Sequence, residues 1–230
     1  MRSEPVVAVP ASQLNGCVHC GAHLSGELAP HACGQCGTPQ PLVPGSLRDP
    51  FEVFQVARRF GQSRGELQKR FLLLSRALHP DRFARASEVA RQASLERMGL
   101  VNEAFRILSD GDAIRDFLFS QSGFQEKGAQ TSEDLELAER WFDLQEQIDE
   151  KGADEGLALL ALFQGELTGL LTEMKLQMQR LEQSFDNQNE PKEALQEMFK
   201  VRHRMNTSQS MLRDVERMRF RLESAGKVHP

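Results

Sequence analysis

Residues 77–84 read Ala-Leu-His-Pro-Asp-Arg-Phe-Ala, and this stretch stands where one helical pattern ends and another is about to begin. Pro80 cannot continue a helix, because it lacks a backbone N–H and its ring clashes with the preceding turn. A second amphipathic run follows from about Val89 to Leu108. We therefore expect His79-Pro80-Asp81 to be a polar loop displayed between two helices, the kind of place where function concentrates. The apolar residues that recur at helical spacing before it, and that we expect in the core, are Leu67, Phe71, Leu74 and Leu78.

Composition divides the chain into three segments. Residues 1–47 hold all four cysteines and six of the ten prolines, which indicates a small four-cysteine metal-binding module and a linker. Residues 48–123 read as four helices, and residues 131–230 read as three longer helices. No strand-like alternation persists anywhere. The sequence therefore predicts an all-α fold, with the cysteine module followed by a four-helix domain and a C-terminal three-helix bundle.

Capping residues mark the expected helix boundaries. Asp49-Pro50-Phe51-Glu52 offers an N-cap aspartate with proline at the first helical position, and Ser63-Arg64-Gly65-Glu66 is a capping box. Gly61 is expected to supply the break between these two helices. Further along, Gly152 is expected to separate two helices, and Pro191 to begin the last one.

Charge is distributed unevenly over a chain of net charge −5. Residues 48–123 carry 13 Lys and Arg against 10 Asp and Glu, whereas residues 131–230 carry 13 against 20. A mildly basic half and an acidic half suggest two units with different partners. Neither is basic enough to indicate nucleic-acid binding.

Hydropathy favours a cytoplasmic protein without a membrane partner. No apolar run approaches the roughly 20 residues that a membrane span needs. The run Val6-Val7-Ala8-Val9 is too short, and too interrupted by prolines, for the core of a signal peptide.

The cysteines form two pairs with the spacing of metal ligands. Each CxxC pair is followed by glycine, which permits a tight turn, and twelve residues separate the pairs. A closed set of four thiolates suits Zn²⁺ in a structural role, because no coordination position stays open for chemistry. The expected zinc ligands are Cys17, Cys20, Cys33 and Cys36.

Four cysteines in this pattern also admit other interpretations. Two disulfides are disfavoured by a cytosolic setting, and a redox CxxC by the absence of a βαβ pattern. An iron–sulfur cluster is chemically allowed, and spacing does not exclude it. His19, His23 and His31 are potential ligands, but with four cysteines at hand we expect them to be bystanders.

Residues 49–119 resemble a J domain, the module by which co-chaperones engage ATPase chaperones of the DnaK type. The resemblance rests on Leu78-His79-Pro80-Asp81-Arg82-Phe83 and on Asn102-Glu103-Ala104-Phe105-Arg106-Ile107-Leu108-Ser109-Asp110, which is close to the family's Asn-Glu-Ala-aromatic signature. It implies that Asp81 makes charge-assisted contacts with the chaperone, while Pro80 fixes the loop shape and His79 contributes hydrogen bonds. The basic residues expected to steer an acidic chaperone surface towards this loop are Arg70, Arg76 and Arg82.

The order of the segments resembles the HscB family, the J-type co-chaperones of iron–sulfur cluster biogenesis, in the form with an N-terminal four-cysteine module. The joint between the helical domains also fits, through Ile114-Arg115-Asp116-Phe117-Leu118-Phe119 and Ser122-Gly123-Phe124. The resemblance implies an HscA/DnaK-type ATPase as one partner and an IscU-type scaffold as the other. Phe199 is a candidate for the family's aromatic contact in the last helix.

In that family the first helix of the C-terminal part binds the scaffold, and this chain offers a matching face. Leu137, Trp141, Leu144 and Ile148 would be buried. The opposite side of this helix would carry carboxylates that have no Lys or Arg four residues later to pair with. Phe142, beside these carboxylates, would be the apolar residue that contacts the scaffold. Where the family has an apolar pair, this chain has Ala138 and Glu139. The alternative is a solvated acidic face with Phe142 packed on a neighbouring helix. The expected scaffold-binding residues are Phe142, Asp143, Glu146 and Glu150.

Two other functions remain as alternatives. One is a general J protein whose C-terminal helices bind another client. The other is a zinc-dependent nucleic-acid adaptor, disfavoured because Arg2 is the only basic residue of residues 1–47. Enzymatic activity is not expected, since no Ser/His/Asp set, phosphate loop or open metal site is recognisable.

Overall fold

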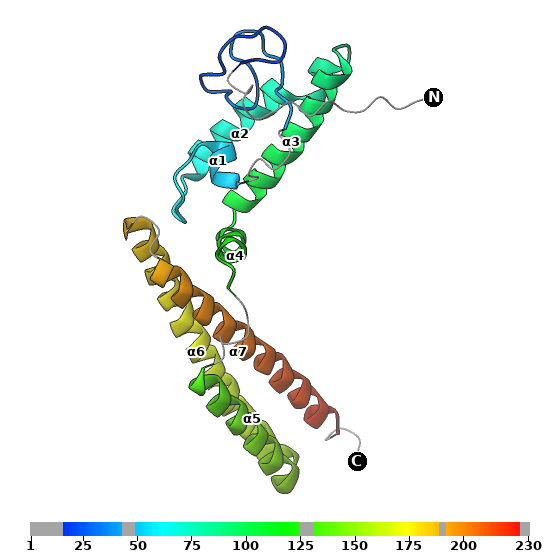
Figure 1. Cartoon of the computed structure of the whole chain (residues 1–230). Helices are drawn as coiled ribbons and strands as arrows, with labels where there is room; N and C mark the ends of the chain where they lie inside the picture. The colour runs from blue at the N-terminus through cyan, green and yellow to red at the C-terminus, as the bar shows by residue number, and fades with distance from the viewer. Residues whose placement is uncertain (1–15, 43–48, 125–130, 189–191, 226–230) are drawn as a thin grey trace. The chain divides into compact units, whose positions relative to one another are not determined.

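The computed structural model describes residues 16–42, 49–124, 131–188 and 192–225, which divide into two compact units, one up to Phe117 and one from Leu118 (Figure 1). In these residues all regular elements are helical, and the only β pairing consists of two isolated bridges in the cysteine segment. The all-α prediction is confirmed. In chain order the elements are α1 (Pro50–Phe54), α2 (Arg64–Leu78), the 3₁₀ helix η2 (Pro80–Phe83), α3 (Glu88–Leu108), α4 (Gly111–Ser122), α5 (Ser132–Lys151), α6 (Ala153–Gln188) and α7 (Lys192–Ala225).

The N-terminal unit is built on α3, which packs against α1, α2 and η2. Phe105 of α3 stacks on Phe71 of α2, with ring centroids 4.4 Å apart, and lies 6.2 Å from the ring of Phe54 in α1. The Asn-Glu-Ala-aromatic signature thus supplies the ring that joins the three helices. The buried apolar residues of this unit include Phe51, Phe54, Leu67, Leu74, Leu78, Ala93, Val101, Ala104 and Leu108.

The first two helices begin where the caps predict, but α1 ends earlier than expected. Asp49 accepts a hydrogen bond from the Phe51 N–H, and Ser63 accepts one from the Glu66 N–H. The break lies at Gln55 rather than at Gly61, because Gln55 takes a left-handed conformation with φ of 54°. Its backbone N–H then closes the last turn of α1.

In the C-terminal unit α6 and α7 form a long pair of helices, and α5 lies alongside them (Figure 1). Trp141 of α5 stacks on Phe163 of α6 at 5.5 Å between ring centroids. Gly152 separates α5 from α6 as predicted, with a φ of 85° that favours glycine. Pro191, the expected start of the last helix, lies outside the described residues. The core consists of Leu137, Trp141, Leu144, Ile148, Leu160, Phe163, Leu167 and Val215.

The α6 helix is more apolar than the sequence analysis suggested. In the described part of the chain, the segment Ala153–Asn187 is long and apolar enough to cross a membrane, judged by length and composition alone. One side of this helix is buried against its neighbours, since Leu160 and Leu167 are fully inaccessible. The core helix of a bundle meets the same criteria.

Candidate functional site

The His79-Pro80-Asp81 tripeptide forms the start of a short 3₁₀ helix at the surface. His79 ends α2, and its Nδ1 accepts a hydrogen bond from the Asp81 N–H at 3.3 Å. Pro80 begins η2 because its fixed φ suits the first helical position and its missing N–H is not needed there. The Asp81 side chain is 90% exposed and that of His79 is 54% exposed. The loop therefore presents a carboxylate outward from a locally ordered turn.

Two hydrogen bonds fasten this turn to the rest of the unit. Ser94 of α3 is fully buried and donates its hydroxyl to the Leu78 carbonyl at 2.6 Å. Arg82 donates from Nη1 to the Arg76 carbonyl at 2.8 Å. Both acceptors belong to the last turn of α2, whose carbonyls lack partners within the helix. Ser94 was not among the predicted residues, because no local pattern reveals a contact between residues sixteen positions apart.

The three basic residues predicted around the loop occupy different environments. Arg76 and Arg82 are exposed near the tripeptide, and Arg82 also caps α2. Arg70 is half-buried and donates from Nη2 to Gln55 Oε1 at 2.7 Å. Burial lowers the pKa of Arg70, while the charge of Glu27 opposes that effect. Arg70 is thus directed towards the end of α1 rather than displayed beside Asp81.

The four cysteines meet in one cluster. Their sulfur atoms all lie within 4.8 Å of one another, with Cys17 and Cys36 3.5 Å apart and Cys20 and Cys33 3.8 Å apart. A disulfide needs sulfurs about 2.05 Å apart, so these thiols are free. A tetrahedron with metal–sulfur bonds of about 2.3 Å has edges of about 3.8 Å, which matches this spacing. The cysteines fit a single metal ion, whereas sulfurs that ligate separate irons of a cluster stand farther apart.

Backbone hydrogen bonds shape the two cysteine loops, and the pKa values of the exposed thiols are shifted in opposite directions. Gly21 and Gly37, both at positive φ, donate their backbone N–H groups to the carbonyls of Cys17 and Cys33 at 2.9 Å. The hydroxyl and backbone N–H of Thr38 lower the pKa of Cys36 to about 6. The pKa of Cys20 is instead raised to about 11, because the hydrogen bond from the Ala22 backbone, which lowers it, is outweighed by burial and the neighbouring thiols. The fit to a metal ion therefore rests on the spacing of the sulfurs.

The histidines lie outside this ligand cluster, as expected. His19 and His23 are exposed. His31 is 1% exposed, and its Nε2 lies 2.8 Å from the Val53 carbonyl of α1. Burial lowers the pKa of His31 to about 4, so the ring is neutral and binds α1 as a hydrogen-bond donor.

The outer face of α5 carries the predicted carboxylates and an exposed aromatic ring. Phe142 is 68% exposed, so the alternative in which it packs on a neighbouring helix is wrong. Leu135, 53% exposed and seven residues earlier, lies on nearly the same side of the helix and was missed. The helical periodicity that identified Phe142 would also have found Leu135. The exposed acidic residues of this face are Glu139, Asp143, Glu146 and Glu150.

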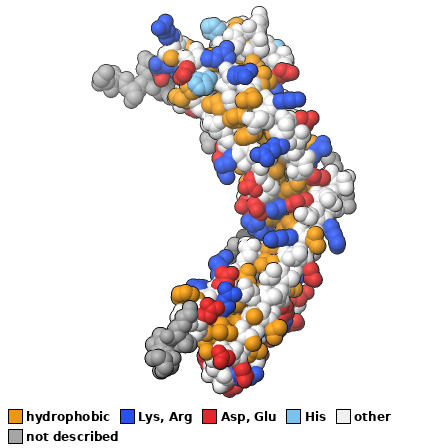
Figure 2. Space-filling model, turned by 180° about the vertical axis from the view of Figure 1, so that it is seen from behind, with side chains coloured by type: hydrophobic (Ala, Val, Ile, Leu, Met, Phe, Trp, Pro, Cys, Tyr) orange, Lys and Arg blue, Asp and Glu red, His pale blue; other side chains and the backbone are white. Residues whose placement is uncertain are grey.

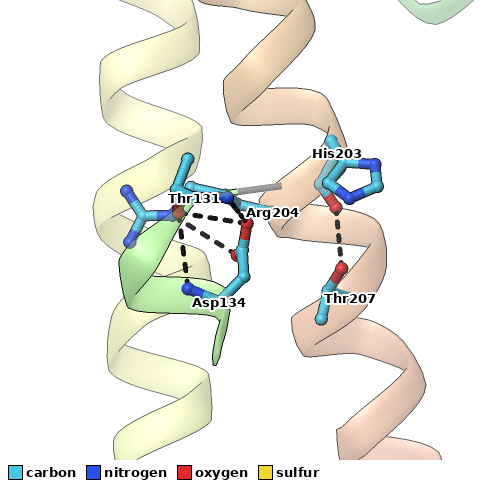
Figure 3. Close-up of polar contacts among 5 residues, drawn as sticks. All are labelled: Thr131, Asp134, His203, Arg204 and Thr207. Atoms are coloured by element: carbon cyan, nitrogen blue, oxygen red, sulfur yellow. Dashed lines mark hydrogen bonds and ion pairs between the residues drawn. The ribbon is translucent and has the colours of Figure 1, made fainter. Parts of the chain in front are cut away.

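A buried polar cluster fixes the start of α5 (Figure 3). The Thr131 hydroxyl accepts from the Asp134 N–H at 3.3 Å, and Asp134 Oδ2 accepts from the Thr131 N–H at 2.8 Å. Asp134 is 4% exposed and lies 3.7 Å from Arg204 of α7. In the same stretch of α7, Thr207 donates its hydroxyl to the His203 carbonyl at 3.2 Å (Figure 3). This capping box and ion pair hold α5 against α7 and so orient its outer face.

Phe199, near the start of α7, is part of an aromatic cluster. Its ring lies 5.2 Å from the rings of both Phe119 and Phe124. Phe124 belongs to the Ser-Gly-Phe joint identified in the sequence. The ring of Phe199 therefore packs within its own unit, where it links α7 to the end of α4.

Surface charge is mixed on the face of the molecule drawn in Figure 2. Lys and Arg side chains alternate with Asp, Glu and apolar side chains, and the described residues form no continuous basic stripe on that face. Nucleic-acid binding depends largely on neutralising phosphates with a basic surface. That nucleic acid is not a partner stays a prediction.

Comparison with known proteins identifies the family. No family model matches the chain. It is 30% identical over 154 residues to a protein of Photobacterium profundum described as "Co-chaperone protein HscB homolog", spanning 66% of this chain and 88% of that protein. A protein of Vibrio vulnificus with the same description is 31% identical over 114 residues, 48% of this chain and 67% of the relative.

A solved structure agrees on the fold. The crystal structure of human co-chaperone protein HscB is similar with a TM-score of 0.56 at 20% identity, covering 87% of this chain and 96% of that one. The tripeptide, the four-cysteine cluster and the three-helix C-terminal unit define a J-type co-chaperone with an N-terminal metal module. This chain belongs to the HscB co-chaperone family.

Proposed function

We propose that this protein acts in iron–sulfur cluster biogenesis by binding an IscU-type scaffold and stimulating ATP hydrolysis by an HscA/DnaK-type chaperone. It performs no chemistry of its own. The observation that carries the proposal is the exposed carboxylate of Asp81, held on an ordered turn between α2 and α3 in a member of the HscB family. Arg76 and Arg82 add positive charge beside that turn.

The scaffold would bind the outer face of α5. Phe142 offers an apolar anchor, and the carboxylates around it attract a basic partner surface. The like charges around the ring repel one another, and a basic partner that covers them would relieve this repulsion while burying the aromatic ring at the interface. The ion pair between Asp134 and Arg204 would hold α5 against α7, so that this face keeps one orientation towards the scaffold.

The metal ion would be zinc in a structural role. Four thiolates close its coordination sphere, so the ion would cross-link the two cysteine loops and leave no position for a substrate. A cytoplasmic location suits the four free thiols, because that compartment keeps cysteines reduced.

The chaperone contact is tested by ATPase assays with Asp81→Asn. The variant keeps the size of the side chain, and because Asp81 is exposed its fold should survive. We expect stimulation of the chaperone to be lost while the circular dichroism spectrum stays unchanged. Stimulation equal to that of the wild type would refute the proposed role of the loop.

The scaffold contact is tested by calorimetry with the double reversal Asp143→Lys and Glu146→Lys. We expect affinity for the scaffold to fall about tenfold or more, equivalent to at least ~1.4 kcal/mol. Reversal of Glu173 on α6 and Glu216 on α7, both exposed, makes the same charge change away from α5. Equal affinities of the two double variants would show that the outer face of α5 is not the binding surface.

A further inference from the structure

Gln40 connects the metal site to the surrounding fold through its side chain. It is 4% exposed, and its Nε2 donates to the Cys17 sulfur at 3.3 Å and to the Thr38 carbonyl at 2.7 Å. Its Oε1 accepts from the Val18 N–H at 3.0 Å. A buried amide with a partner for each of its atoms is held in one orientation, so the N–H that points at Cys17 is fixed.

The main chain of Gln40 is in turn held by an arginine of α3. Arg97 is 8% exposed and donates from Nε to the Gln40 carbonyl at 2.8 Å and from Nη2 to the Pro41 carbonyl at 3.0 Å. Burying a guanidinium is costly unless its N–H groups are bonded, so the arginine and this backbone segment depend on each other. Cys17, Gln40 and Arg97 thereby form one continuous line of hydrogen bonds from the ligand to α3.

A second set of contacts joins the cysteine module to α1 and the residue that ends it. His31 binds the Val53 carbonyl of α1, and Gln55 donates from Nε2 to the Ala29 carbonyl. The module is therefore docked on both α1 and α3. One of these two helices, α3, also holds the end of α2 beside the His79-Pro80-Asp81 turn, through the bond from Ser94 to the Leu78 carbonyl.

We propose that Gln40 is a positioning residue of the metal site and that Arg97 couples this site to α3, so that metal affinity and the stability of the α1–α3 unit depend on each other. An N–H directed at a ligating sulfur orients the thiolate and offsets its charge, which is how residues behind the ligands tune a metal site. Any such coupling acts equally in both directions.

The role of Gln40 is tested by competition for Zn²⁺ between the full chain and a chelator. The Gln40→Glu variant keeps an acceptor for the Val18 N–H but places a carboxylate where the amide donor was. We expect the Kd for Zn²⁺ to rise about 10- to 100-fold. Gln35→Glu is the matched control, since Gln35 is exposed between Cys33 and Cys36. Equal affinities of the two variants would overturn the positioning role.

The role of Arg97 is tested in the same assay and by unfolding. Arg97→Met keeps the length of the side chain and removes its donors, and we expect the Kd for Zn²⁺ to rise about tenfold although no ligand changes. Zn²⁺ should also raise the melting temperature of the N-terminal unit less in this variant than in the wild type.

The control is Arg106→Met, which changes an exposed arginine on the same helix. If Arg97→Met does not fold, Arg97→Lys keeps the charge but loses the paired donors. Zn²⁺ affinity equal to that of the control would refute the coupling.

Discussion

Ser94 offers a sharp test of how the fold presents the His79-Pro80-Asp81 turn. Its hydroxyl is fully buried and donates at 2.6 Å to the carbonyl of Leu78, the last residue of α2. In Ser94→Ala that carbonyl stays buried without its donor, which costs about 1–3 kcal/mol of unfolding free energy. For a domain of roughly 60–100 residues, a loss of about 1.5 kcal/mol lowers the melting temperature by about 6–12 °C.

The two units can be followed separately in this experiment. The chain has a single tryptophan, Trp141, in the core of the C-terminal unit, so its fluorescence follows that unit alone. Far-ultraviolet circular dichroism follows the helices of both units. We expect Ser94→Ala to lower the dichroism transition of the N-terminal unit and to leave the fluorescence midpoint unchanged. Ser109→Ala, exposed at the end of α3, is the control. A melting curve for Ser94→Ala that matches this control would refute the reasoning.

Three further predictions concern the cap of α5, the apolar anchor and the metal. Thr131→Ala removes the capping-box hydroxyl and should cost about 1 kcal/mol, seen as a lower midpoint of Trp141 fluorescence; an unchanged midpoint would contradict the role of the cap. Phe142→Ala should change the unfolding free energy by less than about 0.5 kcal/mol, because the ring is exposed, yet weaken scaffold binding in calorimetry; a large loss of stability would mean that the ring is packed. Removing the metal with a chelator should lower the melting temperature of the N-terminal unit, and added Zn²⁺ should restore it, since the ion binds only the folded cluster; verified removal without any shift would argue against a structural ion.

Local signals in the sequence predicted the helical framework well. Asp49 and Ser63 cap their helices because an N-cap needs only a side chain and a backbone N–H two or three residues away. The burial of Leu137 and Trp141 follows from helical periodicity in the same local way. Periodicity also places Phe142 away from the core side of α5, but it left open whether the ring packs on a neighbouring helix, and the structure shows it exposed.

Contacts between residues that are far apart in the sequence could not be predicted from such local patterns. The left-handed Gln55 that ends α1 has a side chain held by Ala29 and Arg70, far away in the sequence. The bond between Arg97 and Gln40 joins residues 57 positions apart, and neither residue type suggests the other. Arg70 lies in a helical run from which a basic surface was predicted, and nothing in that run reveals its partial burial or its bond to Gln55. The domain boundaries 1–47, 48–123 and 131–230 likewise stay predictions.

The central claim is that one chain brings the scaffold and the chaperone together, and a mixing experiment tests it most directly. The ATPase rate of an HscA/DnaK-type chaperone is measured with an IscU-type scaffold and either wild-type protein or an equimolar mixture of two variants. One variant carries Asp81→Asn, and the other carries the reversals at Asp143 and Glu146. The mixture contains intact chaperone-binding loops and intact scaffold-binding faces, but never both on the same molecule. The account predicts that the mixture fails to restore the scaffold-dependent stimulation. Stimulation equal to that of the wild type would contradict it.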